Sequence, residues 1–301
     1  MKNLLKLSDL NKDQINSILS LAIQLKYENK NGIEHRLLSG KNLGMFFKKS
    51  STRTRVSFEC GINQLGGHAL FLSHDTLQTK RGESIEDTAR TLSRYLDGIM
   101  IRTFDQSEVE KLAEYSEIPI INGLTDFSHP CQVLADLMTI KEYKTAFDGL
   151  KICYVGEGNN MANSLIVGSL KVGMSISIAC PKGYEPDSKI LDFAKGYEDK
   201  FFITENPTEA VQSADVVYTD VWSSMGDEKN IETKRKVFSG VYQINDDLMQ
   251  KTNNAIVLHC LPAHKGEEIT AEVFEKHSAE IFDQAENRLH AQKAVMTMLM
   301  K

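Results

Sequence analysis

The chain has 301 residues and a mass of 33.8 kDa, with 41% hydrophobic and 25% charged residues, which is long enough for two globular domains of ordinary size. Its formal net charge of -6 and pI near 5.8 argue against nucleic acid or an anionic membrane as the main partner, because both repel an acidic surface. A phosphate site would therefore need a local cluster of basic side chains.

The cysteines and the hydropathy pattern indicate a cytoplasmic protein. The five cysteines are odd in number, widely spaced and contain no C-x-x-C pair, so we expect neither a disulfide framework nor a zinc site. No run approaches the roughly eighteen apolar residues of a membrane helix, and lysines, Ser8 and Asp9 interrupt the leucines of the first ten positions. We expect no targeting segment and no membrane segment.

A basic, hydroxyl-rich turn follows the first predicted strand. After an amphipathic helix capped by Ser8 and Asp9, the apolar run 42–47 predicts a buried strand, and residues 48–55 (KKSSTRTR) lead into a helical pattern. Hydroxyl side chains cap helix starts, and the unpaired N–H groups of a helix start attract anions. The turn predicts a phosphate site, although a capped surface helix with solvated charges has the same local pattern.

The next elements continue an alternation of strands and helices. Residues 68–72 predict a strand, a polar loop containing Gln78 follows, and a capping box opens a predicted helix over 84–96. The predicted strand 98–101 then ends at Arg102. Because ligands of parallel α/β sheets bind at the carboxyl ends of strands, Arg102 is a candidate anion partner.

A histidine and a glutamine lie at the start of the next predicted helix. The strand 118–122 leads to His129, Pro130 suits the first helical position, and Gln132 follows within the first turn. His129 and Gln132 could meet one small anion at this helix start. An ordinary capped helix with a hydrogen-bonded histidine has the same local pattern.

The second half opens on a glycine turn that invites comparison with dinucleotide-binding folds. The predicted strand 150–155 runs into Gly-Glu-Gly and a helix, but position 161, where G-x-G-x-x-G requires glycine, is Met161. The next strand, 174–179, ends in Cys180-Pro181 without a ribose-binding acid, so we do not expect NAD(P). Asn159 and Asn160 are instead available to a small polar ligand.

Two later strands also end in polar clusters. The predicted strand 214–219 runs into Asp220, and the strand 255–258 runs into His259 and Cys260. An aspartate at the ligand edge of a sheet can hold an ammonium group, while a lone cysteine is a nucleophile, a polarisable contact or simple packing.

These motifs together resemble the aspartate/ornithine carbamoyltransferase superfamily over nearly the whole chain. Ser-Thr-Arg-Thr-Arg at 51–55, Arg102 and His-Pro-x-Gln at 129–132 are similar to its carbamoyl-phosphate half. Asp-x-Trp-x-Ser-Met-Gly at 220–226 and His-Cys-Leu-Pro-Ala at 259–263 resemble the ornithine branch. The family's aspartate-specific members lack the Ser-Met-Gly loop, and its putrescine-specific members are expected to differ there because putrescine has no α-carboxylate.

The resemblance implies roles for individual residues. For carbamoyl phosphate, it implicates Ser51, Thr52, Arg53, Thr54, Gln78, Arg102, His129, Gln132, Cys260, Leu261 and Arg288. For the amino acid, it implicates Asn160, Asp220, Ser224 and Met225. Those with a catalytic role would be Arg102, His129, Asp220 and Cys260, and Gln78 would be lent to an adjacent subunit.

The resemblance also implies the architecture and the reaction. We expect an α/β protein of two doubly wound domains, each a parallel sheet flanked by helices. Residues 1–142 would bind carbamoyl phosphate and residues 143–284 would bind ornithine. A C-terminal helix, 285–301, would return to the first domain. The implied reaction carbamoylates the δ-amino group of ornithine, with no metal or organic cofactor, in a homotrimer or a multiple of trimers. Three alternatives stay open: a sensor of an anionic metabolite, an inactive homologue, and a carbamoyltransferase for another amine such as putrescine or an ornithine derivative.

Overall fold

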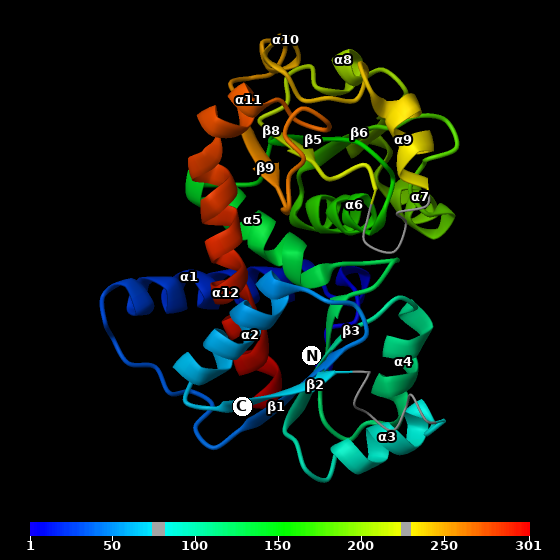
Figure 1. Ribbon diagram of the computed structural model, residues 1–301. Coiled ribbons are helices and arrows are strands. Elements are labelled where there is room, and N and C mark those ends of the chain that lie inside the picture. Colours follow the sequence, from blue (N-terminus) through cyan, green and yellow to red (C-terminus); the bar gives the residue numbers. More distant parts are fainter. Residues whose placement is uncertain (74–81, 224–229) are drawn as a thin grey trace. The chain divides into compact units, whose positions relative to one another are not determined.

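Figure 1 presents the computed structural model of the chain, which describes residues 1–73, 82–223 and 230–301. The chain forms two compact units, one of Met1–Met138 with Asn287–Lys301 and the other of Thr139–Glu286. Each unit contains a parallel sheet flanked by helices, which confirms the predicted fold class. In the described part of the chain, no helix combines the length and the apolar character needed to cross a membrane.

The first unit alternates strands and helices along the chain. Its strands are β1 (Asn42–Phe47), β2 (His68–Ser73), β3 (Gly98–Arg102) and β4 (Ile120–Leu124). Its helical elements are η1 (Leu7–Asp9), α1 (Lys12–Lys30), α2 (Thr52–Gln64), α3 (Ile85–Leu92), α4 (Gln106–Tyr115), and the first part of α5 (Pro130–Lys144).

The sheet of the first unit has the strand order β2-β1-β3-β4, with every pairing parallel. The direction in which successive strands are added reverses between β1 and β3, which makes this point the topological switch of a doubly wound sheet. Helices α3 and α4 cover one face of the sheet, and α1 and α2 lie on the other with the end of the C-terminal helix α12 (Ser278–Met300) (Figure 1).

The last residues of α12 are part of the first unit's interior. Lys293 Nζ donates a hydrogen bond to Gln64 Oε1 at 2.9 Å, and Met300 lies against Gly98 of β3. Gly61 of α2 faces Met296, so closely that an added Cβ would lie 3.0 Å from the Met296 Cε. The expectation that a C-terminal helix packs on the first domain is thereby confirmed.

The second unit has five parallel strands. These are β5 (Lys151–Val155), β6 (Ser175–Ala179), β7 (Phe201–Thr204), β8 (Val216–Thr219) and β9 (Ile256–His259), in the order β7-β6-β5-β8-β9. Its helical elements are α6 (Asn160–Val172), α7 (Ser188–Ala194), η4 (Lys195–Lys200), α8 (Pro207–Ala210), α9 (Ile231–Phe238), α10 (Asp246–Met249) and α11 (Ala271–Lys276). The switch point of this sheet lies between β5 and β8.

Apolar side chains on one face of the second sheet explain its packing. Cys153 and Val155 of β5 and Val217 of β8 share a buried cluster with Trp222 and with Phe238 of α9. Alternate residues of a strand point to opposite faces, so Tyr154 and Tyr218 project to the other side, where their rings stack 6.1 Å apart. Strands buried on both faces explain the nearly continuous apolar runs of the sequence.

Two helix boundaries differ from the sequence predictions. Ser8 and Asp9 lie in the short element η1, and α1 is capped instead by Asn11, which forms a capping box with Gln14. This Asn-x-x-Gln pattern satisfies the first N–H groups of the helix as well as the more familiar Ser-x-x-Glu does. The helix predicted over 84–96 has the predicted cap, Ser84, but α3 ends at Leu92.

Candidate active site

The basic turn after β1 caps α2 as predicted. Ser51 is the N-cap residue, and its Oγ accepts a hydrogen bond from the Thr54 backbone N–H at 3.2 Å. Thr52 and Arg53 are exposed in the first turn, whereas Thr54 is buried. The turn therefore presents the N–H groups of a helix start, hydroxyls and a guanidinium at the carboxyl end of β1, beside the switch point of the sheet.

Arg102 lies at the same edge of the sheet. It ends β3, pairs in register with Phe47 of β1, and its carbonyl accepts a hydrogen bond from the Lys48 N–H at 2.9 Å. The β3–β4 register shifts between Ile101 and Arg102, so that Arg102 lies opposite Leu124. Only 8% of Arg102 is exposed, which leaves its charge strongly felt by neighbouring groups.

A continuous hydrogen-bonded network joins the basic turn to the His129 helix. Arg288 Nη2 donates to Thr54 Oγ1 at 3.1 Å, and Arg288 Nη1 donates to Gln132 Oε1 at 2.7 Å. Gln132 Nε2 in turn donates to Asp136 Oδ1 at 2.9 Å. All four side chains are at least nine-tenths buried. Residues far apart in the sequence thus form one polar cluster, which contains the predicted residues Thr54, Gln132 and Arg288.

His129 is neutral at physiological pH in this setting. Burial lowers its pKa well below the ordinary histidine value, and the positive charges of Arg288, Arg102 and Arg53 lower the pKa further. A neutral imidazole can donate one hydrogen bond without adding another positive charge to the cluster. The three arginines that lower this pKa are those predicted to bind an anion.

Two other basic residues near the turn are structural. Arg55, expected to be structural, pairs with Glu59 at 3.0 Å and lies over the ring of Phe71 at 4.0 Å from its centroid. Lys49 is buried, and its Nζ donates to Asp126 Oδ1 at 2.9 Å. These pairings explain why a charge run of this length does not make every cation available to a ligand.

In the second unit, three strand ends contribute side chains to one small cluster. Asp220 follows β8, is 7% exposed, and accepts hydrogen bonds from Asn159 Nδ2 and Cys260 Sγ, both at 3.0 Å. Its Oδ1 also accepts the Val221 N–H at 2.8 Å, which fixes the carboxylate. Asn159, which follows β5, caps α6 by accepting the N–H groups of Met161 and Ala162. The predicted Asp220 and Cys260 therefore lie together at the ligand edge of the sheet.

Asn159 is a member of the Asp220 cluster, whereas the sequence reasoning favoured Asn160. Its amide both caps the helix and holds Asp220, while Asn160 lies in the first turn of α6 and is partly exposed. The available signal was its position directly after the glycine turn, where N-cap residues occur. Asp136 was passed over in the same way, although its spacing of four from Gln132 puts both on one helix face.

The glycine turn itself has a packing role. An added Cβ on Gly158 would lie 2.2 Å from the Pro186 backbone nitrogen and 2.3 Å from the Glu185 carbonyl carbon. The third position of the fingerprint is a buried methionine, Met161. The close approach of the two backbones thus explains why the second position of the turn is glycine. No bound pyrophosphate is needed to explain this residue.

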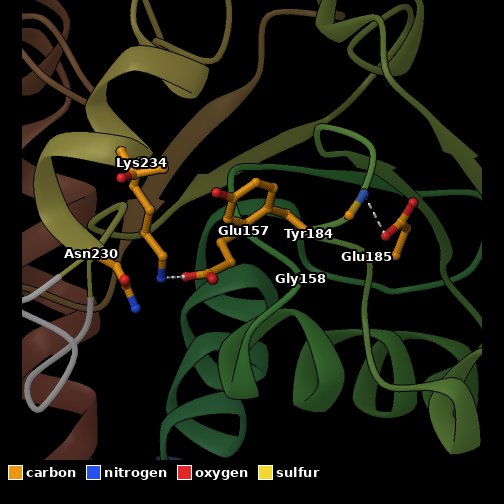
Figure 2. Close-up of a pocket in the computed structure, with 8 residues that line it drawn as sticks. Glu157, Gly158, Tyr184, Glu185, Asn230 and Lys234 are labelled. Carbon is orange, nitrogen blue, oxygen red and sulfur yellow. Dashed lines mark hydrogen bonds and ion pairs between the residues drawn. The ribbon is translucent and has the colours of Figure 1, made fainter.

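A pocket of about 540 Å³ opens beside this turn (Figure 2). It is lined by Glu157, Gly158, Gly183, Tyr184, Glu185, Asn230, Thr233 and Lys234. Lys234 Nζ donates to Glu157 Oε2 at 2.7 Å, so the lysine of the pocket is paired with one of its two glutamates. None of the residues predicted for the site lines this pocket, and we assign the chemistry to the strand-end clusters.

Within the residues that the structure describes, two clusters have side chains suitable for a metal, but some of their ligand atoms are already engaged. Asp220, His259 and Cys260 have potential ligand atoms within 4.8 Å of one another, yet His259 Nδ1 accepts the Leu261 N–H at 2.9 Å. In the other cluster, His264 with Glu267 and Glu268, the Glu267 carboxylate is bound by Arg235. A guanidinium beside a carboxylate disfavours a second cation there.

Three predicted residues, Gln78, Ser224 and Met225, lie outside the described residues. Leu261 is described and partly exposed, in the turn after Cys260.

Comparison with known proteins identifies the family. Residues 2–142 match the family described as aspartate/ornithine carbamoyltransferase, carbamoyl-P binding domain, and residues 148–299 match the family's Asp/Orn binding domain. The chain belongs to the aspartate/ornithine carbamoyltransferase family.

Individual relatives of this carbamoyltransferase family cover the whole chain. A protein of Methanosphaera stadtmanae named ornithine carbamoyltransferase is 54% identical over 306 residues and covers 100% of both chains, and one of Thermococcus kodakarensis with the same name is 51% identical, covering 99% of this chain and 96% of its own. The solved ornithine carbamoyltransferase of Pyrococcus furiosus superposes with a TM-score of 0.94 at 50% identity, covering 99% of this chain and 97% of that one.

Proposed function

We propose that the protein transfers the carbamoyl group of carbamoyl phosphate to the δ-amino group of L-ornithine, giving L-citrulline and phosphate. The observation that carries this proposal is the charge of the two sheet edges, which is positive in the first unit and negative in the second. The first unit gathers arginines around a neutral histidine, and the second holds a buried carboxylate, Asp220, beside Cys260. The names of the full-length relatives support the same activity.

In the first unit, carbamoyl phosphate would bind at the carboxyl ends of β1 and β3. Ser51, Thr52 and Arg53 would hold the phosphate through hydroxyls, helix N–H groups and a guanidinium. Thr54, Arg102 and His129 would donate to the carbonyl oxygen, on which negative charge gathers as the tetrahedral intermediate forms. Arg288 and Gln132, the latter held by Asp136, would complete the part of this site that the first unit supplies. Losing one donor to the developing charge should cost about 3–4 kcal/mol in barrier height.

In the second unit, Asp220 and Cys260 would position the amino acid, with Asn160, Ser224 and Met225 as further contacts. An alkylamine of pKa ~10.4 is protonated at pH 7, and making it neutral costs roughly 4–5 kcal/mol. The departing phosphate is the proton acceptor in this mechanism. The rate should therefore rise between about pH 7 and pH 9, and a flat profile would contradict the proposed proton path.

A carbamoyltransferase for another amine is the alternative within the family. A site for aspartate would need basic side chains toward the second carboxylate of that substrate, whereas the described cluster around Asp220 is acidic. Putrescine lacks an α-carboxylate, so it would leave unused the contacts that we assign to the Ser-Met-Gly segment. The argument therefore favours ornithine.

We also propose a cytoplasmic homotrimer, or a multiple of trimers, in which Gln78 serves a neighbouring subunit. The exposed surface of β2 supports an interface: among the described strands it lies at the edge of its sheet, and Leu70 and Phe71 are 38% and 41% exposed. Unpaired apolar edge strands are rarely left open in solution. A Gln78→Ala chain mixed with an Arg53→Ala chain should regain activity if sites are shared, and no recovery would favour self-contained sites.

The substrate assignment can be tested by offering ornithine, putrescine, aspartate and lysine in parallel with carbamoyl phosphate. The ureido product of each is followed by mass spectrometry. We expect ornithine to give the highest kcat/KM by orders of magnitude. Preference for putrescine would leave the carbamoyl-phosphate half intact and overturn the assignment of the amino-acid half.

A further inference from the structure

The turn that carries Cys260 and Leu261 is fastened to a buried pair of titratable residues that the mechanism above does not use. His259, the last residue of β9, is 1% exposed, and Glu268 is fully buried. The two side chains meet at 3.0 Å between His259 Nε2 and Glu268 Oε1.

The hydrogen bonds of His259 assign its tautomer. Its Nδ1 lies 2.9 Å from the Leu261 backbone nitrogen, which can only donate, so Nδ1 must carry a lone pair. The proton of the neutral ring is then on Nε2 and is donated to Glu268. A carboxylate at this position thus selects the one tautomer that can hold Leu261.

Glu268 also holds the other end of the same turn. Its Oε1 accepts the His264 backbone N–H at 2.6 Å, in addition to the His259 ring N–H. Residues 260–263 are therefore flanked by two residues, His259 and His264, that both donate a hydrogen bond to the same carboxylate oxygen. Leu261 adopts a left-handed φ of +58°, which disfavours a branched side chain and needs such support from its surroundings.

The consequence for the site is the placement of one thiol. Cys260 precedes Leu261, and its Sγ donates to Asp220 Oδ1 at 3.0 Å. We propose that Glu268 and His259 are positioning residues that fix this turn, and through it the Cys260 thiol and the Leu261 backbone, for the substrates. The proposal deepens the proposed function and rests on it.

Paired substitutions separate the two bonds of His259. His259→Asn places an amide oxygen near the Nδ1 position, where it accepts the Leu261 N–H, but it does not reach Glu268. His259→Gln reaches Glu268 and leaves the Leu261 N–H without its acceptor. Glu268→Gln keeps an acceptor oxygen for both attachments, whereas Glu268→Ala removes it.

The first readout is the alkylation rate of Cys260 by iodoacetamide in the ligand-free protein. A Cys60→Ser background removes the one other cysteine that is not buried, since Cys131, Cys153 and Cys180 are buried and burial raises the pKa of each thiol to about 12. We expect His259→Gln and Glu268→Ala to change the alkylation rate severalfold, and His259→Asn and Glu268→Gln to stay closer to the parent.

The second readout is kcat for citrulline formation. We expect a loss of about tenfold in His259→Gln, the rate equivalent of one hydrogen bond, and a smaller loss in His259→Asn. The proposal would be overturned if a folded His259→Gln variant had the alkylation rate and the kcat of the parent. If only Glu268→Ala folds, the same result in that variant would overturn it. If the unsubstituted protein made no citrulline, the proposed function would fail while alkylation still tested the positioning role.

Discussion

At the scale of single residues, the buried His129 of the first unit makes the free energy of unfolding depend on pH. The unfolded chain takes up a proton on His129 as the pH falls below about 6.5, but the folded protein does not, because burial and the arginines lower the pKa of His129. At this residue the unfolded state then binds more protons, so the contribution of His129 to stability falls as the pH falls through this range.

The resulting prediction compares urea unfolding at pH 7.5 and pH 5.5. The wild type should lose roughly 1.4 kcal/mol more than His129→Gln over this interval, from the linkage relation for one histidine. His68, which is exposed, supplies the control, and His68→Gln should behave as the wild type does. Equal pH dependence in the wild type and His129→Gln would show that His129 is protonated in the folded state.

A second residue-scale prediction concerns the amide of Gln132. Asp136 accepts from Gln132 Nε2 and so turns Gln132 Oε1 toward Arg288. Asp136→Ala should lower kcat by about tenfold, since the amide is freed from one hydrogen bond. Asp136→Asn, which keeps an acceptor oxygen, is the matched control and should lose less. Unchanged steady-state kinetics in Asp136→Ala would remove Asp136 from the account.

At the scale of elements, the glycine turn between β5 and α6 depends on the close approach of the 185–186 backbone. Gly158→Ala should raise KM for ornithine at least about tenfold or prevent folding of the second unit, because the new Cβ would overlap the backbone near Pro186. Gly196→Ala is the control, since no atom lies within 4 Å of its added Cβ. Wild-type kinetics and melting in Gly158→Ala would show that the turn can relax.

The sequence predicted the strands and helices that carry the site better than it predicted their ends. Continuous apolar runs located β1, β3 and β4 because buried parallel strands are apolar on both faces. The short helices α8 and α10 were not foreseen, because four helical residues are too few for a period to show. Strand β7, also not foreseen, is as short as β8 and β9, but it is only partly buried at the edge of its sheet, whereas those two are buried along their whole length.

Side chains at strand ends could be predicted because parallel topology brings them to one edge. Arg102, whose charge acts on His129, and the hydrogen-bonded pair of Asp220 and Cys260 were predicted from their places after parallel strands. Asn159 and Asp136 left local signals, an N-cap position and a spacing of four from Gln132, but neither signal reports the hydrogen-bond partner. Glu268 left no such signal, because its role depends on hydrogen bonds from the His259 ring and the His264 backbone.

At the scale of the whole molecule, the first unit is completed by residues distant in sequence. Arg288, Lys293 and Met296 of α12 are buried there, and burial lowers the pKa of Lys293 to about 8. Removing residues 287–301 would delete several buried side chains, each worth about 2–5 kcal/mol, from a unit of ordinary marginal stability.

A chain ending at Glu286 should therefore lose the cooperative unfolding of the first unit, followed by calorimetry and limited proteolysis. Removing only the exposed Lys301 is the control and should leave unfolding unchanged. Protease resistance of residues 1–138 in the shorter chain would mean that this unit folds without α12.

The central claim is that the two sheet edges serve different substrates, and KM values for each substrate in matched variants test it most directly. Citrulline formation is measured in Arg53→Ala, Arg55→Ala and Asp220→Asn. We predict that Arg53→Ala raises KM for carbamoyl phosphate at least about tenfold. Arg55→Ala should stay near wild type, because the Arg55 guanidinium pairs with Glu59. Asp220→Asn should act mainly on KM for ornithine. An unchanged KM for carbamoyl phosphate in Arg53→Ala, or an Asp220→Asn effect confined to carbamoyl phosphate, would contradict the assignment.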